Sequence, residues 1–175
     1  MLLVAATELE LCGHPGLVCG VGPVEAAAMT ARALADDRPD AVLHVGVAGG
    51  RGLAPGSLVV GVEAAYTDIA AGIPVVSRVA PDTALLAAAR TALPEAIVLP
   101  IATSAAVGVG GREWAVEAME GFAVLRACAL AGVPAVEVRA ISNELGEENR
   151  ARWEIPRALA ALGDALPRLL AAFAQ

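Results

Sequence analysis

Apolar residues occur along this chain in short runs, separated by longer stretches that are rich in helix-forming residues. Short continuous apolar runs bounded by turn residues indicate buried strands. They predict strands at residues 1–6, 16–20, 41–47, 57–62, 96–102 and 133–141; the fourth continues through 63–68, and a short extended piece follows at 72–76. Residues 48–52 and 103–111 contain several glycines, and we expect them to form loops.

Helices are predicted between these strands and after the last one. They cover residues 24–35, 82–93, 122–131 and a C-terminal stretch in which leucines recur at helical spacing at positions 159, 162, 166, 169 and 170. Strands that alternate with helices favour a single α/β domain over residues 1–175, built as a three-layer α/β/α sandwich with a central mixed sheet.

Particular residues set the boundaries of these helices. Pro23 suits a first helical turn, Asp82 or Thr83 can cap the second helix, and Gly132 is a typical residue just past a helix end. We expect Pro167 to kink the C-terminal helix or to begin a second one.

The amino-acid composition argues against several classes of protein. Hydrophobic residues make up 57% of the chain and charged residues 18%, which predicts an ordered core. A net charge of -7 argues against a nucleic-acid partner. We expect no membrane association, because glycine, proline or charge interrupts every apolar run and the N-terminus lacks the basic segment of a signal peptide.

Cysteine and lysine usage adds two expectations. The cysteines, Cys12, Cys19 and Cys128, lack metal-ligand spacing and are expected to be reduced thiols in a cytoplasmic protein. All basic residues are Arg, which excludes Schiff-base chemistry and a phosphate-binding lysine loop.

Acidic residues stand at two places where strands or helices meet loops. Glu8 and Glu10 follow the first strand, at the position where α/β proteins bind ligands. Glu117 and Glu120 flank Met119 just before the third helix. The latter pair is explained either by solvated acids at a helix N-terminus or by carboxylates that bind a hydroxyl-bearing ligand such as a sugar.

Two other features favour ordinary structural explanations. Gly20 and Gly22 precede a helix, but a dinucleotide fingerprint needs a further small residue and an acid after the next strand, so we interpret them as a tight turn. His44 lies within an apolar strand, where a structural histidine is the more frequent case.

Several of these segments together resemble the nucleoside phosphorylase/nucleosidase superfamily. The segments are Val45-Gly-Val-Ala-Gly-Gly50 with Leu53-Ala-Pro-Gly56, Val116-Glu-Ala-Met-Glu120 and Arg139-Ala-Ile-Ser-Asn143. They are similar to those of the methylthioadenosine/S-adenosylhomocysteine nucleosidases. The tail from Asn143 to Pro156 is most similar to the futalosine hydrolases. The resemblance covers most of the chain and implies a nucleoside phosphorylase-like fold.

The resemblance also implies roles for individual residues. Glu10 would activate water, with Glu8 as the alternative, and Glu120 would bind the ribose 2′-hydroxyl. The residues implied in substrate binding are Ala48, Gly49, Glu117, Met119 and Ser142, and the third residue implied in catalysis is Asn143.

The implied activity is hydrolysis of a purine N-glycosidic bond in futalosine, on the menaquinone pathway, without cofactor or metal. Adenine-releasing relatives usually have Asp where this chain has Asn143, and an amide suits the 6-oxopurine hypoxanthine. A methylthioadenosine/S-adenosylhomocysteine nucleosidase and a non-catalytic nucleoside-binding protein are the alternatives. A homodimer is also implied. The segment after Asp68 is short for the family, which leaves open whether a partner subunit completes the pocket.

Overall fold

The computed structural model describes residues 1–69, 72–107 and 113–174, and part of the expected 103–111 loop lies outside the described residues. Its strands are β1 (Leu2–Ala5), β2 (Leu17–Val18), β3 (Val42–Gly50), β4 (Leu58–Tyr66), β5 (Arg78–Val79), β6 (Ile97–Thr103), β7 (Val116–Ala118) and β8 (Ala135–Glu144). The helices are α1 (Pro23–Asp37), α2 (Thr83–Ala92), α3 (Gly121–Ala131) and α4 (Ile155–Phe173), with short 3-10 helices η1 (Glu8–Leu11) and η2 (Arg150–Arg152).

The strands form one mixed sheet, as expected. Strand β3 lies between β1 and β8, both parallel to it, and its last two residues also pair with antiparallel β7. The sheet continues through β6 to β4, and β4 pairs with β8 in the antiparallel direction. Strands β3, β7, β6, β4 and β8 therefore close a ring, which makes the sheet more strongly curled than the flat central layer of a simple sandwich.

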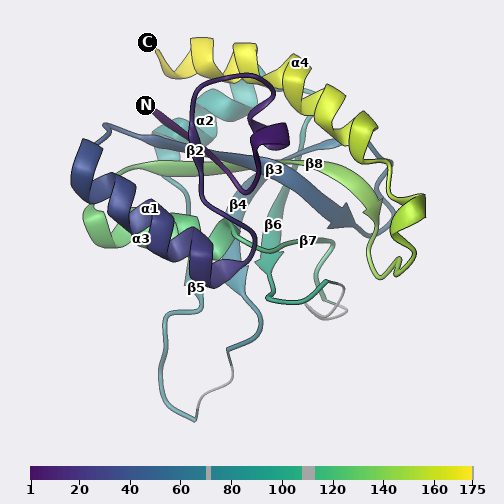
Figure 1. Cartoon of the computed structure of the whole chain (residues 1–175), viewed down its shortest axis with the longest axis horizontal. Coiled ribbons are helices and arrows are strands. Elements are labelled where there is room, and N and C mark those ends of the chain that lie inside the picture. Colours follow the sequence, from purple (N-terminus) through teal and green to yellow (C-terminus); the bar gives the residue numbers. More distant parts are fainter. Residues whose placement is uncertain (70–71, 108–112, 175) are drawn as a thin grey trace.

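Helices cover the sheet in two layers, which confirms the α/β class (Figure 1). On one side, α2 and α4 bury Leu93, Leu162 and Leu166 against β1, β3 and β8. On the other side, α1 and α3 pack together and bury Ala26 and Val124. Among the described residues, no helix is both long and apolar enough to cross a bilayer.

The helix signals were largely correct. Asp82 caps α2 by accepting hydrogen bonds from the N–H groups of Ala84 and Leu85, and Gly132 ends α3 with a positive φ of 70°. The prediction of a second helix at Pro167 was wrong, because α4 continues through this residue to Phe173.

Three features of the strands differ from the prediction. Strand β3 runs through Gly50, so part of the expected 48–52 loop is strand, held by pairing to both β7 and β8. The extended piece expected at 72–76 is not a strand; the pairing with β4 occurs at Arg78–Val79 instead. Strand β7 was not predicted, because it is only three residues long and carries a glutamate.

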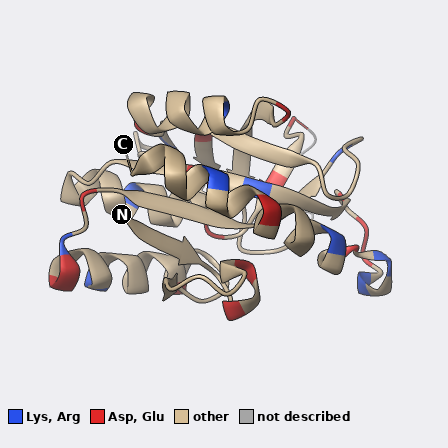
Figure 2. Cartoon of the chain, turned by 90° about the horizontal axis from the view of Figure 1, so that it is seen from above, with Lys and Arg blue, Asp and Glu red and all other residues tan. Residues whose placement is uncertain are grey.

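Charged residues lie mainly on helices and loops (Figure 2). The exceptions matter for function. Among the described residues, five charged ones are almost completely buried within the fold: Glu10, Glu117, Glu120, Glu137 and Arg139. A buried charge is stable only when it is paired or hydrogen-bonded.

Candidate active site

A cavity of about 300 Å³ opens where β1, β3 and β8 end, with β7 on its far wall. Because these three strands are parallel, their carboxyl ends lie at the same edge of the sheet, where ligands bind in α/β proteins. Among the described residues of the lining, the polar ones are Thr7, Glu10, Glu117, Glu120, Ser142 and Asn143, and the rest are apolar residues or glycine.

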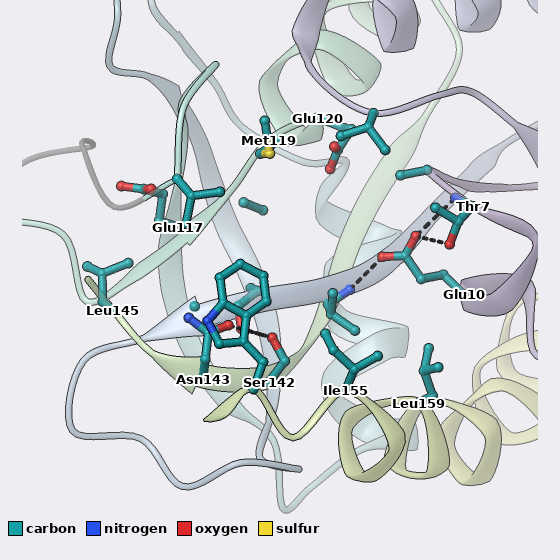
Figure 3. Close-up of a pocket in the computed structure, with 18 of the residues that line it drawn as sticks. Thr7, Glu10, Glu117, Met119, Glu120, Ser142, Asn143, Leu145, Ile155 and Leu159 are labelled. Atoms are coloured by element: carbon teal, nitrogen blue, oxygen red, sulfur yellow. Dashed lines mark hydrogen bonds between the residues drawn. The ribbon is translucent and has the colours of Figure 1, made fainter. Parts of the chain in front are cut away.

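Glu10 is held in place by three donors (Figure 3). One carboxylate oxygen accepts from the backbone N–H of Thr7 at 3.0 Å and from its hydroxyl at 2.7 Å. The other oxygen accepts from the backbone N–H of Val47 at 2.9 Å, which connects η1 to the end of β3. All three contacts are donors, so they match an ionised carboxylate, which can only accept.

Glu120 lies just before α3 and is 4% exposed. Its Oε1 accepts from the backbone N–H of Gly22 at 3.0 Å, and its Oε2 lies 3.4 Å from Nη1 of Arg139. Gly22 is the residue before α1, so the carboxylate lies where two helices begin. The positive ends of helix dipoles favour a negative charge at such a point.

Ser142 and Asn143 form the opposite, uncharged side of the cavity. The Ser142 hydroxyl donates to Oδ1 of Asn143 at 2.7 Å, and Nδ2 of Asn143 donates to the carbonyl of Glu144 at 3.0 Å. These contacts fix which way the amide faces. Both residues lie at the end of a strand, as expected: β8 ends at Glu144, and Asn143 pairs with Gly49.

Met119 and Glu117 line the wall between these two sides. Figure 3 shows the Met119 sulfur near Glu120, whereas the Glu117 carboxylate lies beyond Met119, away from Glu10. Glu117 belongs to β7 rather than to the approach to a helix, and it pairs with Gly49 of β3. Ala48 and Gly49 also line the cavity, so every site residue named from the sequence lies at its wall.

The structure separates the two acids after the first strand. Glu10 is 6% exposed and lines the cavity, whereas Glu8 is exposed and lies outside it. Two aromatic residues also differ in their surroundings. Trp153 lines the cavity, but Phe122 stacks on Tyr66 in the core between α1, α3 and the sheet, with ring centroids 5.3 Å apart.

Burial changes the titration of the groups behind the cavity. Burial raises the pKa of the Cys19 thiol to about 12, and the neighbouring Glu120 adds to this, so the thiol stays protonated. Cys12 and Cys128 are also free thiols, as expected. Burial tends to lower the pKa of Arg139, but the surrounding acids outweigh it, and the pKa is raised above its usual value.

Sequence reasoning missed the importance of Arg139 and its neighbours. Arg139 appeared only as the first residue of a motif, Glu137 was not singled out, and His44 was interpreted as structural. His44 is fully buried, is hydrogen-bonded to the carbonyl of Val4 and does not line the cavity, as expected of a histidine that binds no ligand directly. A signal existed, because two charges two residues apart in an otherwise apolar strand point to the same buried face.

Comparisons with known proteins identify the family of this chain. The sequence profile of the Phosphorylase superfamily matches residues 13–175. A futalosine hydrolase of Streptomyces coelicolor is 40% identical over 187 residues, covering 87% of this chain and 77% of the relative. A futalosine hydrolase of Thermus thermophilus is 47% identical over 62 residues, which are 34% of this chain and 28% of the relative.

Solved structures show the same fold. A methylthioadenosine/S-adenosylhomocysteine nucleosidase of Colwellia psychrerythraea with bound adenine superposes with a TM-score of 0.85 at 22% identity, covering 97% of this chain and 93% of the other. A futalosine hydrolase of Helicobacter pylori gives a TM-score of 0.83 at 20% identity, covering 97% and 96%. The chain belongs to the Phosphorylase superfamily and, within it, to the family of the futalosine hydrolases.

Proposed function

We propose that this protein hydrolyses the N-glycosidic bond of futalosine and releases hypoxanthine and dehypoxanthine futalosine. The observation that carries the proposal is the arrangement of the cavity, with two fixed carboxylates, Glu10 and Glu120, facing an oriented amide, Asn143. Such a cavity can bind a sugar between its two sides and a purine against the amide. The identity to a curated futalosine hydrolase over most of the chain supports the same substrate.

The carboxylates have separate tasks in this mechanism. As the glycosidic bond breaks, positive charge develops on the ribose, and a carboxylate bonded to the 2′-hydroxyl binds the sugar more tightly in that state. We assign this role to Glu120, with Met119 packed against the ribose. Glu10 orients the attacking water and takes its proton, while the oxygen forms the new bond to the sugar carbon.

The departing base needs a partner for its developing negative charge. The Asn143 amide can donate from Nδ2 to the O6 of hypoxanthine and accept at Oδ1 from N7 once N7 carries a proton, a pattern that suits hypoxanthine. Trp153 lies beside this position, because the N–H of the next residue, Glu154, bonds to the carbonyl of Ser142 at 2.7 Å. An indole there offers a flat apolar surface to a purine.

Water is a better nucleophile for this cavity than phosphate. Among the described lining residues none is Lys or Arg, and Glu10 places a negative charge where a phosphate would approach. Two negative charges that lie close together in a partly desolvated site repel each other strongly. The proposal is therefore hydrolysis rather than phosphorolysis.

The test is chromatography of futalosine, methylthioadenosine and S-adenosylhomocysteine after incubation with the protein. We expect free hypoxanthine from futalosine and little adenine from the other two. Cleavage of methylthioadenosine alone would support the adenine-releasing alternative, and no turnover of any of them would support a binding protein. The Glu120→Gln variant should lower kcat/KM by about 10² to 10³-fold, since removing one group that stabilises transition-state charge costs this much.

We further propose a cytoplasmic enzyme of menaquinone biosynthesis that acts as a homodimer. The paired surfaces of α1 and α3 support the dimer, because they form an apolar groove with exposed Val24 and Leu130 at its edges. An apolar face of this kind is typical of an interface between copies. Sedimentation equilibrium should give twice the chain mass, and Leu130→Glu should shift the protein toward the monomer.

A further inference from the structure

A group of three polar side chains lies behind the cavity and does not reach it. Glu137, Arg139 and His44 are each 0% exposed and are not part of the lining. Glu137 and Arg139 lie two residues apart on β8. The parallel pairing with β3 sets His44 beside Glu137 and Gly46 beside Arg139. Strand register therefore brings the three together on the α3 side of the sheet.

Each nitrogen of the Arg139 guanidinium has a different neighbour. Nε donates to Oε1 of Glu137 at 2.8 Å, Nη2 contacts Nε2 of His44, and Nη1 lies 3.4 Å from Oε2 of Glu120. The His44 contact fixes the tautomer. Its Nδ1 lies 3.1 Å from the carbonyl of Val4 and must donate to it, so Nε2 is left as the acceptor for Arg139.

Two glycines make room for this arrangement. A Cβ at Gly121, the residue after Glu120, would stand 2.3 Å from both carboxylate oxygens of Glu137. A Cβ at Gly46 would stand 2.3 Å from Nη1 of Arg139 and 2.7 Å from Oε1 of Glu10, so the guanidinium also lies close to the second acid of the cavity. The backbone on both sides is thus shaped around the group.

Stability alone does not explain a buried glutamate here. Burial raises the pKa of Glu137 despite the neighbouring Arg139, and no partner for its Oε2 is found in the described ranges. Buried ion pairs are often no more stabilising than apolar residues of the same volume. The charge pattern is therefore explained better by orientation than by stability.

We propose that Glu137 and His44 are positioning residues that lock the Arg139 guanidinium against Glu120 and thereby aim the Glu120 carboxylate at the ribose 2′-hydroxyl. The inference rests on the proposed hydrolysis of a ribonucleoside. Glu137 contacts Nε of Arg139 and His44 contacts Nη2. These two contacts fix the direction in which Nη1 points. With Oε1 of Glu120 bound to Gly22 and Oε2 facing Arg139, the plane of the carboxylate is fixed before substrate arrives.

The test compares Glu137→Leu, which removes the acceptor, with Glu137→Gln, whose amide oxygen can still accept from Nε. Rates are measured with futalosine and with its 2′-deoxy analogue, alongside the melting temperature. For Glu137→Leu, kcat with futalosine should fall about 10- to 100-fold, the range of one charge-assisted hydrogen bond, with KM nearly unchanged. The rate with the 2′-deoxy analogue should change less than about 3-fold, because Glu120 has no hydroxyl to hold there. Glu137→Gln should keep most of the preference for the 2′-hydroxyl.

Two further variants separate positioning from general destabilisation. His44→Leu, made as a separate variant, should also lower the preference for futalosine over its 2′-deoxy analogue. Glu95→Leu, which breaks an exposed pair with Arg168 far from the cavity, should leave it unchanged. If Glu137→Leu fails to fold, Glu137→Gln and His44→Leu carry the test.

The outcomes also separate this inference from the proposed function. An active wild type whose folded Glu137→Leu and His44→Leu variants retain the full preference for the 2′-hydroxyl would overturn the positioning role alone. A wild type that cleaves futalosine no faster than the blank would overturn the proposed function, and the positioning role with it.

Discussion

A methyl group at Gly121, the first residue of α3, would collide with the carboxylate of Glu137. The added Cβ would lie 2.3 Å from both oxygens, a distance that real Cβ atoms do not tolerate. Glu137 cannot simply turn away, because its Oε1 accepts the 2.8 Å hydrogen bond from Arg139 and its side chain is fully buried. The substitution Gly121→Ala therefore forces either the helix start or the ion pair to move.

The cost follows from the contacts involved. Overpacking a core costs about 1–3 kcal/mol, and a buried donor left without its partner costs about another 1–3 kcal/mol. The better helix propensity of Ala offsets up to about 1 kcal/mol. We expect the free energy of unfolding to fall by roughly 1–6 kcal/mol.

The measurement is urea denaturation followed by circular dichroism, in a double-mutant cycle with Glu137→Ala. If the collision is the cause, Gly121→Ala should cost little once Glu137 is removed, and the two effects should fail to add by at least about 1 kcal/mol. The matched control is Gly163→Ala in α4, where a Cβ would meet only Cys12 at 3.9 Å. That change should be neutral or slightly stabilising. Additive costs in the cycle would refute the reasoning.

Three further predictions concern the cavity and the buried histidine. Glu10→Gln should lower kcat by about 10² to 10⁴-fold, as loss of a general base does, whereas Glu8→Gln should not, and equal effects in steady-state assays would contradict the assignment of the base. Asn143→Asp sets a carboxyl oxygen against the Glu144 carbonyl, and this contact favours the protonated form of the acid. The ratio of kcat/KM values should therefore move toward adenine nucleosides. An unchanged ratio would contradict the substrate argument. Burial and then Arg139 lower the pKa of His44 well below 6.5, so the unfolded chain takes up this proton first as pH falls. The stability of wild type relative to His44→Gln should therefore be constant above about pH 6.5 and fall below it, with a slope approaching about 1.4 kcal/mol per pH unit, and parallel denaturation curves across that range would contradict this.

The sequence was sufficient for most elements because apolar periodicity and boundary residues act locally. Pro23, Asp82 and Gly132 mark helix boundaries in the structure much as they do in the sequence. The ring closure of the sheet could not be predicted in this way. The ring closes because β8 pairs with β3 on one side and with β4 on the other. The residues of β8 carry no local signal that identifies these two partners.

The candidate site was only partly predictable for a similar reason. Glu10, Glu120 and Asn143 could be named because they belong to recognisable segments, and the structure brings them to one cavity. The role of Arg139 depends on the register between β3 and β8, which sets His44 and Gly46 beside it. Register is a long-range property, so the buried group behind the cavity becomes visible only when the strands are paired.

The parts of this cavity come from distant points of the chain, and this has a consequence for folding. Glu10 is fixed by Val47, and Glu120 is fixed by Gly22, 98 residues earlier, and by Arg139 on β8. Contacts between such distant residues form late, since the intervening chain must be ordered first. Recovery of activity after denaturation should therefore lag behind recovery of helical signal, and activity will report completion of the whole fold.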